Sequence, residues 1–391
     1  MRKFRTIVLA AGLSSAPTLG VEPYLSHLHA TADAPIFTTY AAAMERSEFT
    51  LDQGYHLRFY DPGSGIDLIT DRAGDLCLAF LHGGEWVDEL AEMASAPVIT
   101  VSYPDLVVYH FDPFPDIRVD VRFLVYSSRA AVQEITVRNR GTAAAELRVV
   151  PFLRHDDRTF SDVRFHPEND AVSFVHEEPP DSWTREHQVP YVEEVQNLLL
   201  VSPPADRLAS YRSDRGGPQE TDHVAGSDFL SAPEHPNQAR SDPTDLVRVI
   251  AAPRTLRLDA GQSQRLRVVR AVAPAGHDPT ELEQRARALL EVDLDQHVAA
   301  NEKLFRRIPR LKFADPDQEM LYWGAFSLMR QVMLPPEGKC AHNYYLFSRE
   351  PTWGWGHGGQ VFHESLTMLA YAQMDTSPGA AIMKCIFGPD W

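Results

Sequence analysis

Between about residue 48 and residue 273, the chain alternates apolar and polar positions in short runs. Alternation with a period of two, bounded by Gly, Pro and Asp, is typical of half-buried antiparallel strands. Many such runs without helices between them predict a large β-sandwich. The runs are Tyr55–Tyr60, Val98–Tyr103, Leu106–Phe111, Ile117–Tyr126, Val132–Asn139, Ala145–Phe152, Leu246–Ala251 and Leu266–Val272.

Two turns in this region contain glycines. The stretch VRNRGTAAAEL predicts a β-hairpin with Gly141 in its turn, where a positive φ suits glycine. Asp259–Gly261 predicts a second turn. Residues 202–245 are rich in Pro, Gly, Asp, Ser and Arg, so we expect long surface excursions there. These excursions either reach over a neighbouring domain or have no role.

The pattern changes to helical spacing at Asp278. Asp278 and Pro279 form an N-cap and first-turn pair, and Thr280–Phe305 carries apolar residues at helical spacing. We predict one long, charged helix that leads out of the sandwich as a linker. A second helix is predicted over Asp315–Met333, with Pro316 in its first turn.

The second helix has an apolar flank that we expect to be buried: Met320, Tyr322, Trp323, Phe326 and Met329. A loop is predicted from Leu334 to His363, then a helix over Glu364–Asp375 and the start of another at Pro378. The whole pattern predicts four segments: a signal-like leader over 1–20, a β-sandwich domain over 21–275, a helical linker over 276–313 and a helical domain that starts at 314 and continues to 391.

The amino-acid composition and net charge of the chain indicate which kinds of binding partner are expected. The chain has 391 residues, of which 44% are hydrophobic and 23% charged, which is ordinary for a globular protein with a buried core. Its net charge is −17, from 54 acidic and 37 basic residues. Nucleic acid and anionic membranes are therefore unfavourable partners, and a neutral or cationic small molecule is expected. Cys77, Cys340 and Cys385 are widely spaced, so we expect small buried side chains and no disulfide framework.

The N-terminal residues give a signal for the cellular location of the protein. No apolar run reaches the roughly 18–20 residues that a membrane-spanning helix needs. The start, MRKFRTIVLAAGLSSAP, has a basic end and a short apolar run, which resembles a secretory signal. An extracytoplasmic location, periplasmic or secreted, is slightly favoured over a cytoplasmic one. The alternative is that this segment is an N-terminal strand or a disordered lead-in.

The candidate site is the stretch EPTWGWGHGGQVFHE, residues 350–364. Its tryptophans offer flat faces of the kind that stack on pyranose rings, and its His, Gln and Glu side chains can hydrogen-bond to hydroxyls. Four glycines let the backbone approach a ligand closely. The alternative is a Trp/Gly-rich loop that seals a helical domain. The expected substrate contacts are Tyr345, Trp353, Trp355, His357, Gln360, His363 and Glu364.

Other chemistries have weaker signals in the sequence. His357, His363 and Glu364 are not spaced as in HExxH, so we predict no metal site. GWGHGG lacks the GK[ST] ending of a phosphate-binding loop, and the G-x-S-x-G elbow of serine hydrolases does not occur. We therefore expect neither a metal nor an organic cofactor.

The order of these parts resembles the glycoside hydrolases with an (α/α)6 barrel. A sandwich, a linker and helices that carry NYYLFSREPTWGWGHGGQVFHESLTMLAY most closely resemble glycoside hydrolase family 63, the processing α-glucosidases and their bacterial relatives. Trp355–His363 matches a Trp-Asp-x-x-Phe-His-like stretch of that family, although Gly or His stands where an Asp is expected. The resemblance covers most of the chain in architecture, but only about Ala314–Asp375 in motif.

The resemblance implies inverting hydrolysis of an α-glycosidic bond by two carboxyl groups about 6.5–9.5 Å apart. It places both groups on later barrel helices. We therefore expect this chain to be an N-terminal fragment with an incomplete barrel, little hydrolytic activity and Glu364 as its one catalytic candidate. The expected ligand is an oligosaccharide or a glucoside. Two alternatives stay open: a non-catalytic carbohydrate-binding or assembly protein, and a disaccharide phosphorylase of similar design.

Overall fold

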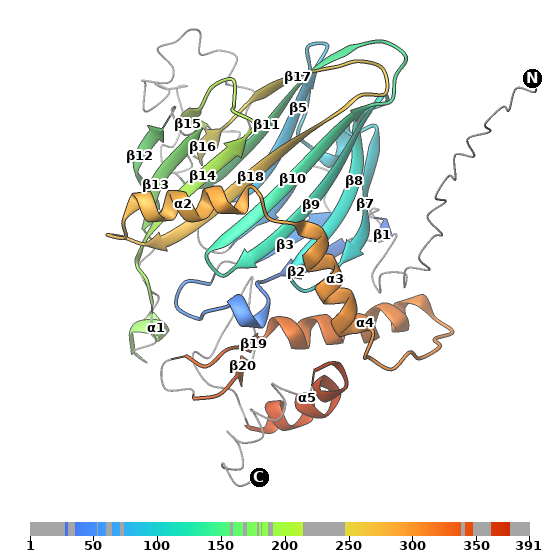
Figure 1. The fold of residues 1–391 in the computed structure, drawn as a ribbon, viewed down its shortest axis with the longest axis vertical. Helices are drawn as coiled ribbons and strands as arrows, with labels where there is room; N and C mark the ends of the chain where they lie inside the picture. The colour runs from blue at the N-terminus through green and yellow to red at the C-terminus, as the bar shows by residue number, and fades with distance from the viewer. Residues whose placement is uncertain are drawn as a thin grey trace, which may run out of the picture.

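The computed structural model contains two antiparallel β-sheets stacked as a sandwich, with helices at one end and across one face (Figure 1). Short helical turns η1 (Met44–Arg46) and η2 (Leu90–Glu92) and the short helix α1 (Ser182–Glu186) lie between strands. The structure describes residues 28–29, 36–52, 54–59, 65–70, 74–156, 159–166, 170–177, 180, 182–186, 191–213, 247–337, 341–346 and 361–375.

The first sheet has nine strands in the order β1-β7-β8-β9-β10-β18-β14-β13-β12 within the described residues. Neighbouring strands pair antiparallel throughout. Its strands are β1 (Leu28–His29), β7 (Ser95–Ser102), β8 (Leu106–Phe114), β9 (Ile117–Ser127), β10 (Ala130–Asn139), β12 (Phe160–His166), β13 (Ala171–Glu177), β14 (Glu194–Ser202) and β18 (Ser263–Pro274).

The second sheet also has nine described strands, in the order β15-β16-β11-β5-β4-β3-β2, with β17 paired to β11 and β6 paired to β5. These pairings are antiparallel too. Its strands are β2 (Ile36–Tyr40), β3 (Tyr55–Phe59), β4 (Ile66–Ile69), β5 (Asp75–His82), β6 (Glu85–Val87), β11 (Ala145–Asp156), β15 (Ala209–Ser213), β16 (Val247–Ala251) and β17 (Arg254–Leu258).

The main core lies between the two sheets, and strand alternation builds it. On β9, Val119, Val121 and Phe123 are fully buried in this core, while the alternate residues Arg118 and Asp120 face outward and form an ion pair at 3.3 Å. Successive side chains of a strand point to opposite faces, so one apolar set is enough to fix the register. The predicted antiparallel sandwich is confirmed.

The predicted hairpin at Gly141 is wrong. β10 lies in the first sheet and β11 in the second, so residues 140–144 form a corner between the sheets. Gly141 does not have a positive φ; a Cβ there would meet Asn139 Oδ1 at 3.1 Å and Asp116 Cβ at 3.2 Å, so glycine permits a close approach. At the second predicted turn Gly261 does have a positive φ, +76°. Alternation identifies strands but does not say which strand pairs with which.

Two helices, instead of the one predicted, follow the sandwich. α2 (Pro279–Leu289) begins where expected, because the Asp278 side chain caps its first turn. α3 (Leu294–Phe305) has a cap of its own: Asp293 accepts a hydrogen bond of 3.0 Å from the backbone N–H two residues on. The apolar spacing runs through both helices, and the prediction missed that Asp293 favours a new start over continuation.

α4 (Pro316–Gln331) begins at the predicted proline, with Asp315 as its cap. Trp323 and Phe326 are buried as expected, but Met320 is 44% exposed, which contradicts its predicted burial. The reason is position along the helix: residues 315–321 are all exposed, so the first third of α4 extends beyond the core.

The segment predicted as a loop after α4 contains a small ladder. β19 (Met333–Leu334) pairs with β20 (Tyr344–Tyr345). α5 (Val361–Met374) follows and begins three residues earlier than predicted, so His363 and Glu364 lie in its first turn. The helix expected from Pro378 lies outside the described residues.

Two apolar clusters join the helices to the sandwich. α2 lies across the outer face of the first sheet and buries Leu282, Ala286 and Leu289 against it (Figure 1). A second cluster, called the junction cluster here, joins the end of the sandwich to α3, α4 and α5. Its buried members are Met44, Tyr103, Leu106, Leu124, Leu294, Phe305, Ile308, Trp323, Phe326, Met333, Met368, Tyr371 and Met374.

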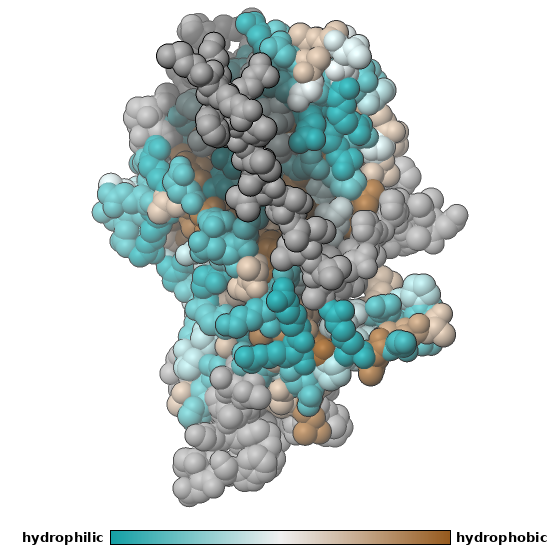
Figure 2. Space-filling model, turned by 45° about the vertical axis from the view of Figure 1, so that its right-hand side comes forward, coloured by the Kyte–Doolittle hydropathy of each residue, from teal (hydrophilic) through white to brown (hydrophobic). Residues whose placement is uncertain are grey.

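The surface differs between the sandwich and the helices. Figure 2 shows a largely hydrophilic face, with apolar side chains gathered toward the helical end. The large hydrophobic side chains recorded as exposed all belong to residues 311–369: Leu311, Met320, Leu321, Leu328 and Leu369. Among the described residues, no helix combines the length and the apolar character needed to cross a membrane.

Truncation of Leu282 tests the packing of α2 on the sheet. Leu282 is buried in this contact, so Leu282→Ala should lower the free energy of unfolding by about 2–4 kcal/mol. Gln284→Ala, on the exposed side of the same helix, is the matched control and should change it by less than about 0.5 kcal/mol. Equal effects of the two substitutions in urea titrations would show that α2 does not pack as described.

Candidate functional site

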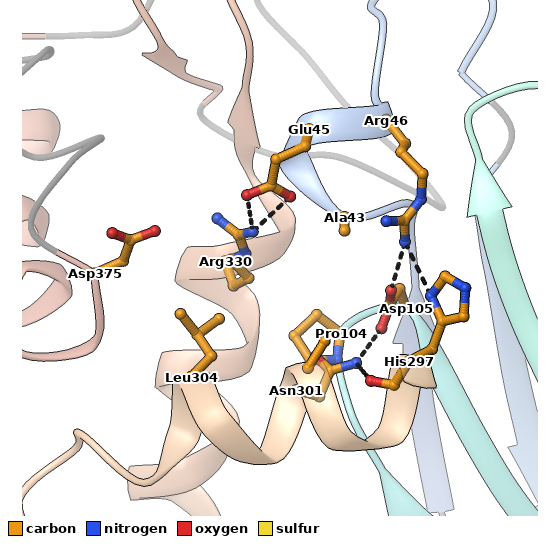
Figure 3. A pocket seen from close by; sticks show the side chains of 11 residues that line it. Ala43, Glu45, Arg46, Pro104, Asp105, His297, Asn301, Leu304, Arg330 and Asp375 are labelled. Atoms are coloured by element: carbon orange, nitrogen blue, oxygen red, sulfur yellow. Dashed lines mark hydrogen bonds and ion pairs between the residues drawn. The ribbon is translucent and has the colours of Figure 1, made fainter. Parts of the chain in front are cut away.

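A cavity of about 250 Å³ lies where the sandwich meets the helices (Figure 3). Five parts of the chain line it: η1, the turn before β8, α3, and the C-terminal ends of α4 and α5. Its lining combines ionisable side chains with small apolar ones. The ionisable members are Glu45, Arg46, Asp105, His297, Arg330 and Asp375.

Arg330, in the last turn of α4, forms the first polar group of the cavity. Its guanidinium donates to both oxygens of Glu45, at 2.6 and 2.8 Å, and to the Tyr371 hydroxyl of α5 at 2.8 Å. It also lies 3.9 Å from the Met44 sulfur. The Arg330 side chain is 7% exposed and that of Glu45 54%, so the pair has one buried and one solvated end.

Arg46, Asp105, His297 and Asn301 form the second polar group. Arg46 donates to Asp105 at 3.1 Å and contacts His297 Nδ1 at 3.4 Å, and its charge lies 5.2 Å from the centre of the Tyr126 ring. Asn301 of α3 donates to the other Asp105 oxygen at 2.6 Å. Both oxygens of this buried carboxyl group therefore have donors from the protein itself, as a buried carboxylate requires.

The surroundings shift the pKa values of these groups. Burial raises the pKa of Asp105 above its usual range, although Asn301 and Arg46 act against this shift. Burial, together with the Arg46 charge, lowers the pKa of His297, so its imidazole is neutral at pH 7. Burial also acts on Glu45, but the adjacent Arg330 charge outweighs it and lowers the pKa of Glu45.

The residues predicted to bind sugar fall mainly outside this description. Trp353, Trp355, His357 and Gln360 lie outside the described residues, and His363 and Glu364 are described only as backbone in the first turn of α5. Tyr345 is half-buried and packs against the junction cluster. These assignments therefore stay predictions.

The structure does describe how the two ends of the aromatic stretch are held. Before the stretch, Leu346 is buried and its N–H donates to the carbonyl of Val332, at 2.8 Å. After it, α5 contacts α4 through the hydrogen bond from Arg330 to Tyr371. Gln331 between them donates to the carbonyl of Pro104, at 3.1 Å, which ties the end of α4 to the sandwich. Arg330, Gln331 and Val332 thus hold the described segments on both sides of the stretch.

The cavity residues were not predicted from the sequence. One signal was available: Arg330 is a cation within the apolar run LMRQVM, a position that indicates a buried ion pair. Glu45 and Asp105 stand in segments without regular periodicity, so nothing local marked them as its neighbours. Their proximity to α4 depends on tertiary contacts across 285 positions of sequence in the case of Glu45.

Comparisons with known proteins give likenesses to solved structures alone. No protein-family model matches the chain, and no curated protein matches it significantly. A kojibiose phosphorylase candidate from the human microbiome is similar over 88% of this chain and 41% of its own length, with 9% identity and a TM-score of 0.46. A family GH92 α-mannosidase from Bacteroides thetaiotaomicron is similar over 78% and 39%, with 8% identity and a TM-score of 0.35. A candidate aldose 1-epimerase from Escherichia coli K12 is similar over 61% and 99%, with 10% identity and a TM-score of 0.32.

These neighbours carry names of enzymes that act on carbohydrates. The chain spans about two fifths of the length of the first two. Because each TM-score lies below 0.5, the likenesses assign neither a family nor an activity to this chain. The sandwich followed by helices is established by the structure itself, while family 63 membership and the (α/α)6 barrel stay predictions.

Removal of the Arg330 charge tests its role at the junction. Arg330→Met leaves Glu45 and Tyr371 without their shared partner, so we expect a loss of about 1–3 kcal/mol in the free energy of unfolding. The matched control is Arg306→Met, which breaks an exposed pair with Glu302 and should cost less than about 0.5 kcal/mol. Urea titrations in which both variants lose the same stability would contradict a special role for Arg330.

The pH dependence of Glu45 gives a second test. Its pKa is lowered in the folded chain, so its contribution to stability is present above the ordinary glutamate pKa of about 4.3 and is lost as the pH falls through the lowered value. The difference in unfolding free energy between the wild-type chain and Glu45→Gln should therefore be constant from pH 7 to 5 and shrink below about pH 4.3. A difference that stays constant down to pH 3 would show that Arg330 does not stabilise the ionised form.

Proposed function

We propose that this chain serves a carbohydrate-processing function and that residues 353–360 form one wall of its sugar site. The supporting composition is two indoles, several glycines and polar side chains within a few positions, a combination suited to a pyranose ring with its apolar face and ring of hydroxyls. The observation that carries the proposal is the frame: Leu346, before the stretch, and Tyr371, after it, are hydrogen-bonded to residues 330–332, which are themselves fixed to the sandwich. A ligand wall needs such support from rigid elements.

The finer proposal is inverting hydrolysis of an α-glycosidic bond. It rests on the match of Trp355–His363 to the family 63 motif and on the order of sandwich, linker and helices. The cavity at the junction is not proposed as the hydrolytic centre. Asp105 has both oxygens engaged and Glu45 is held as a carboxylate by Arg330, so neither is placed to exchange a proton with a glycosidic oxygen.

Saccharide binding to Trp355 is the direct test. Titration of the chain with maltose and other α-glucosides, followed by indole fluorescence, should give a saturable change, because a stacked sugar alters the environment of the ring. Trp355→Ala should weaken binding by about tenfold or more, the loss expected of a stacking contact. Trp86→Phe, on strand β6 of the sandwich, is the matched control and should leave binding unchanged.

The products of an incubation with substrate distinguish hydrolysis from phosphorolysis. Incubation with an aryl α-glucoside should release free sugar if the chain hydrolyses it, and sugar phosphate only in the presence of inorganic phosphate if it is a phosphorylase. Binding without either product would support the non-catalytic alternative. Neither saturable binding nor turnover, in a chain whose far-UV circular dichroism shows it to be folded, would refute the carbohydrate proposal.

A further inference from the structure

The cavity at the junction is small. At about 250 Å³ it lies below the roughly 300–1,000 Å³ of ordinary ligand pockets. Its volume suits one small molecule. As far as the structure describes it, the lining of the cavity includes none of the predicted sugar contacts.

The charges of the cavity argue against an anion. Three carboxyl groups, those of Glu45, Asp105 and Asp375, face two guanidinium groups. Arg330 donates to both oxygens of Glu45, and Arg46 donates to Asp105. A phosphate or carboxylate ligand would have to displace these partners, since guanidinium groups bind such anions through the same donors.

The donor set also argues against a metal ion. No three His, Cys, Asp or Glu side chains in the described part of the chain are grouped so that they could hold one. An apolar ligand is disfavoured too, because it would remove the half-exposed Glu45 carboxylate from water and offer it no hydrogen bond in return.

The lining suits a ligand with many neutral donors and acceptors. The oxygens of Glu45 can accept further hydrogen bonds, the neutral His297 imidazole can donate or accept, and Asn301 lies beside it. Small apolar side chains complete the lining and suit the C–H face of a ring: Ala43, Pro104, Ala300 and Leu304.

We propose that this cavity is a binding site for one neutral polyhydroxylated molecule of monosaccharide size. The ligand would contact the sandwich through η1 and the helices through α3 and α4 at the same time (Figure 3). This inference is independent of the proposed sugar wall, since it rests on the junction residues alone.

A cavity-filling substitution tests the site without breaking its ion pairs. Ala299 and Ala300 are neighbouring exposed residues of α3, of which Ala300 lines the cavity and Ala299 does not. Isothermal titration calorimetry of the full chain with D-glucose and with myo-inositol should show saturable binding that Ala300→Leu weakens by at least about tenfold. Ala299→Leu, with the same added volume, should leave the affinity unchanged, and so should Trp355→Ala.

A second variant, Asp375→Asn, tests the polar lining of the cavity, and three outcomes would contradict the proposal. Asp375→Asn keeps the shape of the cavity and should change the affinity for the neutral polyols while leaving the far-UV circular dichroism as in the wild type. Tighter binding of inorganic phosphate, or of a simple alkylamine, than of either polyol would overturn the assigned ligand class. Polyol binding that survives Ala300→Leu and disappears in Trp355→Ala would assign all sugar binding to the wall. The absence of saturable binding at millimolar polyol would refute the site.

Discussion

The guanidinium of Arg330 holds the helical part of the molecule on the sandwich. Its partners are Glu45, 285 positions away in sequence, and Tyr371, 41 positions away. A buried charge costs several kcal/mol unless it is paired and hydrogen-bonded. An arginine keeps its proton in proteins, so its charge is present in the folded chain, and the Glu45 carboxylate and the Tyr371 hydroxyl offset the cost of burying it. The junction therefore forms only when η1, α4 and α5 come together.

The residues after Arg330 extend this dependence to the candidate site. Gln331 accepts a hydrogen bond of 2.9 Å from the Thr39 hydroxyl and donates to Pro104, both in the sandwich. Val332 accepts from Leu346, at the start of the aromatic stretch. The side-chain hydrogen bonds of Gln331, the backbone hydrogen bond of Val332 and the junction cluster thus all stabilise the C-terminal end of α4. The positions of the described segments before and after the stretch therefore depend on the sandwich as well as on the helices.

Local signals in the sequence predicted most of the sandwich and the helix starts. Alternation located β7, β8, β9, β10, β11, β16 and β18, and proline after a capping aspartate located α2 and α4. These signals are local. They depend on the alternation of side chains along a pleated strand and on the backbone N–H groups that have no partner within the helix at its start. They failed where the outcome is set by distant contacts. The corner at Gly141 depends on which sheet β11 joins, and the exposure of Met320 depends on where the core ends.

The candidate sites differ in the same way: one was predicted from local sequence, and the other depends on distant contacts. The aromatic stretch was found from composition, because sugar-stacking residues cluster in sequence, whereas the cavity is assembled from η1, the turn at Asp105, α3, α4 and α5 and has no motif. Arg330 belongs to both, since it lines the cavity and supports one end of the stretch. Under the two proposals above, a ligand in the cavity that strengthens the contacts of Arg330 stabilises the frame of the wall. Linkage then requires a sugar on the wall to favour the cavity ligand by the same factor. The shared residue makes the junction the place where the two sites would communicate.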